Sequence, residues 1–580
     1  MSYFVKKTEK PKGTYLQIYN SYYVPGNKNN KSELVKTLGY VDELKNQGID
    51  DPIAFYTDEC KKKNQEIREE KKIKKSELVD DKDYLFNYGY FLVKSIMNTL
   101  NLKQIFDIYC TQFNKRFNHY NVFTNLVYSR IVGPCSKLKT HNVVLPRLYE
   151  KPDFSLDDIY TCLDDLGSNY HDIIAILNAG LDKFYKFDTS KVFFDCTNFY
   201  FEIDREDTYR RKGPSKEKRT DPLVGLGLLL DKNCIPITMQ LYPGNESEIY
   251  RLGECINEAK NQGLIVGRTI HVADKGLNCA RNIFEAKKSQ NGYIFSKSVY
   301  KLPEIEQQWL FLEDDYTNKY TIITDPNTGE VIFKYKTCVD DYNYSFEEDD
   351  ENGKAKKHVF KVKEKRVLYW SKKLHEKKIY ELNNMQEKLL KLITSKAKKE
   401  EFGPYSSYVI LKTEKKNGQK GEEIVKAEMN SKKFELERKL AGFNLLVTSE
   451  INESPQKIYD IYHELWKIEE TFRILKNYLN TRPVFLQKRE KIDGHMLVCY
   501  TSILLTRILQ FLVFKDKLDV NDIYDFIKNA QLIIDNDIMF NLLKSTYIKK
   551  EIIDAFPLDF NLRRPTVDAM KKIMEFKVKI

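Results

Sequence analysis

The stretch "KVFFDCTNFYFEID", Lys191–Asp204, decides the fold class of this chain. Its aromatic and β-branched residues predict a packed β-strand. Asp195 lies within it, where a packed strand has no need for a charge. We therefore take Asp195 as a candidate functional residue in preference to a strand-edge carboxylate.

The residues that follow predict an α/β arrangement. The expected elements are the strands "LVGLGLLL" (223–230) and "IPITMQLY" (235–242), a helix from Ser247 to Asn261, the strand "RTIHVAD" (268–274), a further helix, and the strand "YIFSK" (293–297). This order is three antiparallel strands, helix, strand, helix, strand. Asp274 ends the fourth strand, so adjacency of the first and fourth strands would bring it close to Asp195. One sequence does not show that they are adjacent, and an aspartate before glycine is also common in turns.

The third candidate carboxylate lies on "YHELWKIEETFRILK", 462–476, which predicts one amphipathic helix. Tyr462, Glu469 and Lys476 recur at seven-residue intervals, on one face with Trp466 and Arg473. Taken alone, the pattern is typical of a surface helix with solvated charges.

Three carboxylates are the hard oxygen ligands that Mg²⁺ and Mn²⁺ prefer. Two such ions about 3.5–4 Å apart support in-line phosphoryl transfer. Other chemistries find no support: the eight histidines form no H-x-x-x-H or H-E-x-x-H pair, and G-x-S-x-G and the phosphate-binding G-x-x-x-x-G-K-[ST] are missing. "GLG" at 225–227 lies within a strand and opens no helix, which disfavours dinucleotide binding.

Length and composition indicate a multidomain globular protein. A chain of 580 residues suggests roughly three to five compact units. We expect an N-terminal β unit of two strands plus a charged helix or linker at 1–80, a helical region at 81–185, an α/β core at 186–297 and 456–515, a β-rich insertion at 298–455, and a C-terminal helical region at 516–580. The helical region at 81–185 suits DNA binding and plain packing about equally.

The net charge, the cysteines and the apolar stretches indicate the kind of partner and the cellular compartment. The formal net charge of +11 weakly favours a polyanionic partner. The ten cysteines lack C-x-x-C spacing, which is typical of a reducing cytoplasm. The apolar stretch Met496–Phe514 is interrupted by Arg507 and Gln510, so we expect a buried core helix and no membrane span.

Several motifs together resemble the bacterial insertion-sequence transposases of the DDE type, within the insertion-sequence-four superfamily. Tyr462, Glu469 and Lys476 match the spacing of its Y-x2-R-x3-E-x6-K signature, although Leu465 stands at the arginine position. The other similar segments are "FFDCTNFYFE", "GPSKEKRTD", "YPGNESE", "VADKGLNCARN", "RIVGPCSKLKT" and "RPVFLQKREKIDGH". They occur in the family's order over most of the chain.

The resemblance implies a ribonuclease H-like catalytic core interrupted by a β-rich insertion, with helical N- and C-terminal regions. It implies that Asp195, Asp274 and Glu469 are both catalytic residues and metal ligands, and it favours Glu469 over its neighbour Glu470. The expected cofactor is Mg²⁺, for which Mn²⁺ may substitute. The expected partners are transposon terminal inverted repeats, target DNA, and a second copy of the chain in a synaptic homodimer at the nucleoid.

The predicted DNA contacts come from two segments. On the 462–476 segment we expect Tyr462 and Lys476 to contact phosphate, Trp466 to pack beneath a base or stack on it, and Arg473 to join them. The basic loop "YRRKGPSKEKRT", 209–220, supplies the further candidates Arg210, Arg211, Lys212, Lys216 and Arg219, for which a solvated loop is an equally good interpretation.

The sequence thus predicts a DNA transposase that cleaves its element's ends and joins the freed 3′-hydroxyls to target DNA. Two alternatives stay open. One is a transposase-derived DNA-binding protein without activity, and the other is a metal-dependent nuclease without strand transfer.

Overall fold

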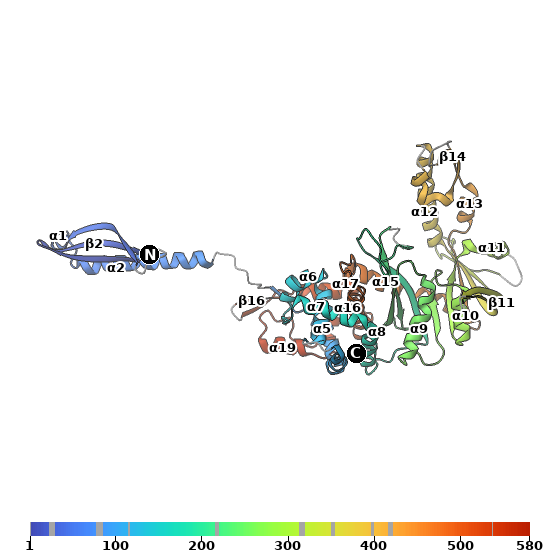
Figure 1. Ribbon diagram of the computed structural model, residues 1–580, viewed down its shortest axis with the longest axis horizontal. Helices are drawn as coiled ribbons and strands as arrows, with labels where there is room; N and C mark the ends of the chain where they lie inside the picture. Colours follow the sequence, from blue (N-terminus) through green and yellow to red (C-terminus); the bar gives the residue numbers. More distant parts are fainter. Residues whose placement is uncertain are drawn as a thin grey trace. The chain divides into compact units, whose positions relative to one another are not determined.

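The computed structural model describes residues 2–22, 30–76, 85–113, 117–214, 220–312, 319–349, 354–395, 399–415, 422–535 and 538–580. The chain divides into two compact units, Met1–Asp83 and Tyr84–Ile580, both of which contain helices and strands (Figure 1). The α/β expectation is confirmed. The expected boundaries at 185, 297, 455 and 515 all fall within the second unit.

The first unit is an antiparallel sheet accompanied by helices. Its elements are β1 (Ser2–Lys10), β2 (Gly13–Tyr22), β3 (Lys31–Tyr40), α1 (Val41–Asn46) and the charged α2 (Pro52–Ser76). Strand β1 pairs with β2 along its whole length and was missed, because its lysines and glutamate dilute the apolar alternation. The expected turn between β2 and β3 lies mostly outside the described residues.

The second unit is built on one nine-stranded sheet, ordered β10-β11-β12-β15-β9-β8-β5-β6-β7. Five of these strands follow the predicted order: β5 (Lys191–Tyr200), β6 (Leu223–Leu230), β7 (Pro236–Pro243), β8 (Ile270–Ala273) and β9 (Gly292–Lys297). Strands β5, β6 and β7 are antiparallel, whereas β5, β8 and β9 run parallel. Strand β8 is therefore the neighbour of β5, as the site hypothesis requires.

Helices cover both faces of this part of the sheet. Val192, Phe194 and Cys196 of β5 pack in a core with α9 (Arg251–Asn261) and α10 (Ala280–Lys288), which lie together in Figure 1. Phe193 and Phe199 belong to the larger core on the opposite face. Because side chains alternate along a strand, Asp195 shares the face of Phe193.

The β-rich segment at 298–455 is joined to this sheet. Its strands β10 (Thr321–Thr324), β11 (Val331–Asp349), β12 (Ala355–Ser371) and β15 (Phe443–Thr448) continue the sheet, and β15 pairs with β9. The sequence analysis named no strand at 355–371, where β12 lies and pairs with β11 throughout its length. The first part of β12 is mostly exposed, whereas the stretch from Glu364 to Tyr369 is mostly buried.

The rest of the segment forms a small cluster with its own core. Helix α11 (Glu304–Phe311) precedes β10, and the cluster contains α12 (Lys372–Thr394), β13 (Val409–Lys415), β14 (Glu422–Met429) and α13 (Ser431–Lys439), which lie together in Figure 1. Its buried residues are Leu382, Leu389, Phe402, Val409 and Phe434.

Helices from both ends of the second unit pack together. The elements are α3 (Phe91–Leu100), α4 (Lys103–Cys110), α5 (His119–Val132), α6 (Lys137–Lys139), α7 (Leu156–Ser168), α8 (Tyr170–Leu181), α16 (Arg489–Arg507), α17 (Val520–Asn529), α18 (Lys550–Ala555) and α19 (Val567–Glu575). The expectation of an entirely helical C-terminal region is wrong. Strand β16 (Gln531–Asp535) pairs with β17 (Ile538–Asn541) and with β4 (Leu85–Asn87), which ties the two ends of the unit together.

Helix α16 continues as a π-helix, Ile508–Val513. Among the described residues this is the one helix long and apolar enough to cross a membrane, and 83% of its apolar window is buried inside the protein. It behaves as a core helix. Gly494 allows α7 to approach closely, because a Cβ there would lie 2.1 Å from the carbonyl oxygen of Leu163.

Candidate active site

Three carboxylates line one small pocket of about 180 Å3. Asp195 comes from β5, Asp274 from the end of β8, and Glu469 from α15 (Trp466–Arg473). The other lining residues are Tyr462, His463, Leu465, Trp466 and Ile468. The structure thus brings the three predicted catalytic residues to one pocket, together with two of the predicted DNA contacts.

The strand register explains why the two aspartates meet. Phe194 of β5 is paired with Ala273 of β8, and in each strand the aspartate is the next residue. The carboxylate of Asp195 also accepts a hydrogen bond from the amide of Cys196, at 2.8 Å. Parallel pairing therefore places both acids at the carboxyl end of β8.

The expectation of one regular helix over 462–476 is wrong. Helix α14 (Pro455–His463) ends before α15, and a π-helix (Ile474–Tyr478) follows α15. The junction is wound tightly, since the amides of Leu465 and Ile468 bond to the carbonyls three residues earlier, at 3.1 and 3.0 Å. Overwinding before α15 and underwinding after it change which residues share a face.

The residues that recur at seven-residue intervals, Tyr462, Glu469 and Lys476, therefore do not all lie at the pocket. Tyr462 and Glu469 line the pocket, whereas Lys476 lies on the π-helix and does not. Trp466 lines the pocket and is 52% exposed, and Arg473 is exposed outside it.

Two ion pairs hold the junction against its surroundings. Lys191, the first residue of β5, pairs with Glu464 between α14 and α15 at 2.9 Å. Arg507 of α16, which is fully buried, pairs with Glu470 at 2.9 Å and donates to the hydroxyl of Thr471 and the carbonyl of Lys467. The two neighbouring glutamates therefore have different environments: Glu470 is held by Arg507, and Glu469 faces the pocket.

Tyr462 bridges α14 to the sheet. Its hydroxyl donates a hydrogen bond to Oδ1 of Asp274 at 2.8 Å. Burial raises the pKa of Tyr462 well above its usual value, and the Asp274 carboxylate raises it further, so the hydroxyl stays a donor. This contact orients Asp274, whereas the sequence had suggested phosphate contact for Tyr462.

His463 is a lining residue that the sequence analysis did not single out. Its Nδ1 donates to the carbonyl of Tyr459 at 2.9 Å, and its ring stacks on the Tyr459 ring. Its position next to Tyr462 was the signal that would have identified it.

Replacement of Tyr462 by Phe removes one hydroxyl and tests its role. We expect the free energy of unfolding to fall by about 1 kcal/mol, the ordinary worth of such a hydrogen bond. Any DNA cleavage should slow by about tenfold, because Asp274 loses its orienting partner. Affinity for DNA should change less than twofold, roughly. A phosphate-binding role predicts the reverse, namely weaker DNA binding with an unchanged cleavage rate for bound DNA.

The basic loop is partly engaged within the protein. Arg210 is largely buried and pairs with Asp207 at 2.6 Å, and Arg211 lies 3.8 Å from Glu206. Lys212 is exposed. Lys216 and Arg219 lie outside the described residues. None of the described basic residues of this loop is among the residues that line the pocket.

The loop is anchored on α16 by a buried acid. Tyr209 donates to Asp493 Oδ1 at 2.5 Å. Burial raises the pKa of Asp493 from 3.8 to about 6, although the hydrogen bond from Tyr209 opposes the shift. The folded protein therefore binds this proton more tightly than the unfolded chain does.

This shift predicts a pH-dependent stability. The contribution of protonated Asp493 is complete below about pH 4 and is lost as the pH rises through about 6. Asp493→Asn should remove that loss. The free energy of unfolding of the variant, relative to that of the wild type, should therefore rise by about 3 kcal/mol between pH 4 and pH 7. Urea denaturation of both proteins across that range measures the difference. A constant difference would show that Asp493 does not titrate in this way.

The donor set suits a hard divalent cation in its chemistry, because it consists of carboxylate oxygens. The described part of the chain contains no group of three or more His, Cys, Asp or Glu side chains that is already placed to hold a metal ion. Asp195, Asp274 and Glu469 surround one pocket, but they would have to draw closer together to share an ion.

No known protein family matches this chain, and no curated protein matches it either.

Proposed function

We propose that this chain is a DNA transposase of the DDE type, which cleaves the ends of an insertion element and joins the 3′-hydroxyls to target DNA. One observation carries the proposal. The same pocket of about 180 Å3 is lined by Asp195, Asp274 and Glu469, although 79 and 195 residue positions separate them along the chain. Carboxylates gathered in this way repel one another unless a cation or a proton compensates them.

The sheet topology supports a ribonuclease H-like core for this proposal. Strands β7, β6 and β5 are antiparallel, β8 and β9 continue parallel to β5, and helices cover both faces. The first acid lies on the first strand and the second acid at the end of the fourth. The β-rich segment enters between β9 and the helix that carries the third acid, as the resemblance implies.

In the proposed site Asp195, Asp274 and Glu469 hold Mg²⁺, or Mn²⁺ in its place. The metal supplies activation of a water or 3′-hydroxyl and stabilisation of the leaving oxygen. Tyr462 keeps Asp274 oriented through its 2.8 Å hydrogen bond. Trp466, half exposed on the pocket, offers a ring to a base of the bound strand.

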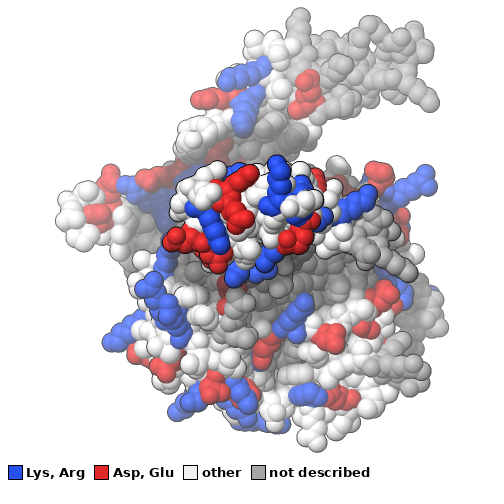
Figure 2. Space-filling model, turned by 90° about the vertical axis from the view of Figure 1, so that its left-hand side faces the viewer, with Lys and Arg blue, Asp and Glu red and all other residues white. Residues whose placement is uncertain are grey.

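The proposed DNA path is local to the carboxylate pocket, and the face drawn in Figure 2 is not uniformly basic. Figure 2 shows Lys and Arg side chains interspersed with Asp and Glu across the face in view. Arg473 and Lys476, close in sequence to Glu469, are the proposed phosphate contacts.

A strand-transfer assay with labelled terminal DNA tests the proposal. Joined product that requires Mg²⁺ supports the transposase. Cleavage without joining replaces it with a metal-dependent nuclease, and DNA binding without cleavage replaces it with an inactive DNA-binding derivative. A homodimer on paired ends, measured by light scattering, is expected only in the first case.

A further inference from the structure

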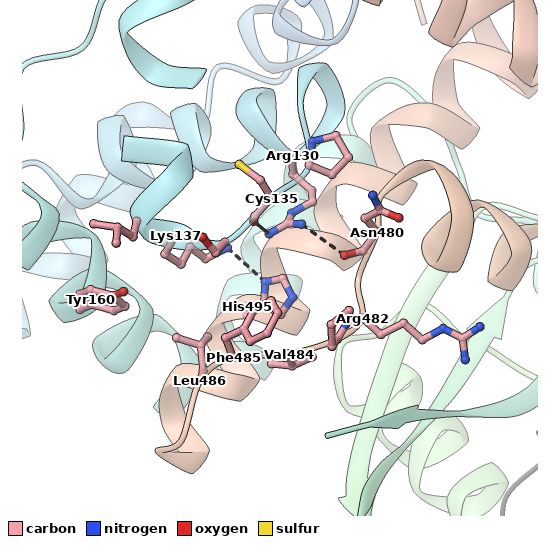
Figure 3. Close-up of a pocket in the computed structure, with 14 residues that line it drawn as sticks. Arg130, Cys135, Lys137, Tyr160, Asn480, Arg482, Val484, Phe485, Leu486 and His495 are labelled. Atoms are coloured by element: carbon pink, nitrogen blue, oxygen red, sulfur yellow. Dashed lines mark hydrogen bonds between the residues drawn. The ribbon is translucent and has the colours of Figure 1, made fainter. Parts of the chain in front are cut away.

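A cavity of about 650 Å3 lies away from the carboxylates (Figure 3). Its walls come from the end of α5, the segment up to Leu138, α7, the segment 480–486, and α16. Two motifs that the carboxylate site leaves unused, "RIVGPCSKLKT" and "RPVFLQKREKIDGH", converge here. The segment 480–486 follows the π-helix after α15, so the cavity is linked through the chain to the helix that carries Glu469.

Buried positive charge gathers on one side of the cavity. Arg130 and Lys137 are both buried, and none of the fourteen described residues that line the cavity is acidic. Arg130 is committed to main-chain carbonyls, those of Cys135 at 3.0 Å and Leu479 at 3.3 Å. Arg482 extends away from the cluster in Figure 3 and lies over the Tyr200 ring. Lys137 is therefore the cation that remains for a ligand.

Within the described part of the chain, the ammonium group of Lys137 makes one side-chain hydrogen bond. His495 Nε2 donates to the carbonyl of Thr481, so its Nδ1 accepts from Lys137 Nζ at 3.1 Å. An ammonium group has three donors, and this bond uses one. A buried ammonium without an anionic partner is costly, so an anion beside it would be strongly favoured.

The pKa of Lys137 reflects its burial beside another cation. Burial, together with the nearby Arg130, lowers the pKa of Lys137 to about 7. The amine is therefore close to losing its proton at neutral pH, and a bound anion would stabilise the charged form.

The opposite side of the cavity is aromatic and apolar. Phe485 is 69% exposed, and Tyr160 lines the same cavity from α7. Ser136 and Asn480 add polar groups to the lining of the cavity. Flat rings beside a cation suit a nucleobase with its phosphate, whereas an alkyl chain would leave these polar groups unpaired.

We propose that this cavity binds a nucleotide unit, with its phosphate on Lys137 and its base against Phe485 and Tyr160. The unit is either a free nucleoside monophosphate or one residue of a single DNA strand. The proposal goes beyond the transposase function and does not rest on it, because binding can be measured in EDTA, where the carboxylate site is inactive.

Alkylation of Cys135 by iodoacetamide provides a local readout. Cys135 lines the cavity and is partly exposed, as are Cys279 and Cys338, which lie elsewhere. Thymidine 5′-monophosphate should slow alkylation of Cys135 by about tenfold while the other two react as before. Thymidine alone or inorganic phosphate alone should have little effect at the same concentration.

Variants test the assigned contacts. Lys137→Met should raise the half-saturating nucleotide concentration by about tenfold or more, and Phe485→Ala by about tenfold. The matched controls should not change it. Lys336→Met removes another buried lysine, which donates to the carbonyls of Trp309 and Leu312, and Tyr380→Ala removes an equally exposed ring at 68%. The ratio of rates with and without nucleotide corrects for altered thiol reactivity.

A short 5′-phosphorylated oligothymidylate separates the two sources. Stronger protection by the oligonucleotide than by the monophosphate identifies a DNA strand, and the opposite order identifies a free nucleotide. The proposal is overturned if neither probe protects Cys135 at millimolar concentration, if phosphate alone protects equally well, if a fatty carboxylate binds in their place, or if Lys137→Met retains full protection. Loss of DNA cleavage would bear on the carboxylates alone.

Discussion

Asp195→Asn is expected to reduce cleavage of terminal DNA by at least about a thousandfold, equivalent to about 4 kcal/mol of transition-state stabilisation. The amide keeps the shape of the carboxylate but loses the charge that a divalent cation requires. Glu469→Gln should act in the same way from α15. Affinity for terminal DNA should stay within a few fold, because neither acid is proposed to hold phosphate directly.

The same substitution should leave the fold intact and make it slightly more stable. Three carboxylates around one pocket repel each other, so removal of one charge relieves that repulsion. Asp460→Asn on the exposed side of α14 is the matched control and should retain cleavage. Cleavage by the Asp195→Asn protein at the wild-type rate would remove this residue from the site.

Arg507→Met should lower the free energy of unfolding by about 3–5 kcal/mol, the usual effect of breaking a buried ion pair from one side. The variant leaves Glu470 without its cation and leaves the Thr471 hydroxyl and the Lys467 carbonyl without the donor from α16. Because domains are stable by only about 5–15 kcal/mol, this one change removes a large part of the total.

Arg473→Met provides a close comparison, since Arg473 also contacts Glu470, at 3.4 Å, but is 64% exposed. Its loss should change stability by less than about 0.5 kcal/mol. Urea denaturation of the two variants beside the wild type measures both effects. Equal small effects would show that α15 is not held by Arg507.

The succession of β5 to β9 followed from the sequence because each strand is a short run of aromatic, β-branched or other apolar residues bounded by turn residues. The continuation of the sheet through β12 and β15 did not follow. In β12, buried Glu364 and Arg366 pair with each other at 3.1 Å, so charged side chains lie inside a strand that the sequence did not identify. Strand β16 was not predicted, because the residues before it have a helical pattern.

The acidic residues of the candidate site could be predicted from the sequence, but the geometry around them could not. Asp195 and Asp274 stood out because charges are unexpected in packed strands and at their ends. The tight junction at Glu464 keeps helical backbone angles, φ −63° and ψ −14°, so the apolar spacing gave no sign of a break. Nor does spacing show that Tyr462 reaches Asp274, a contact made across 188 residues of chain.

The pairing of β15 with β9 means that residues 298–455 are not a removable module. A chain trimmed of them would expose the main-chain amides and carbonyls of β9 along a flat, apolar border, where Ile294 and Phe295 are buried in the intact protein. Such a border is a template on which further chains can add. Shortened versions of this protein should therefore be recovered as aggregates, and minimal variants for biotechnology should preserve β15, which pairs with β9.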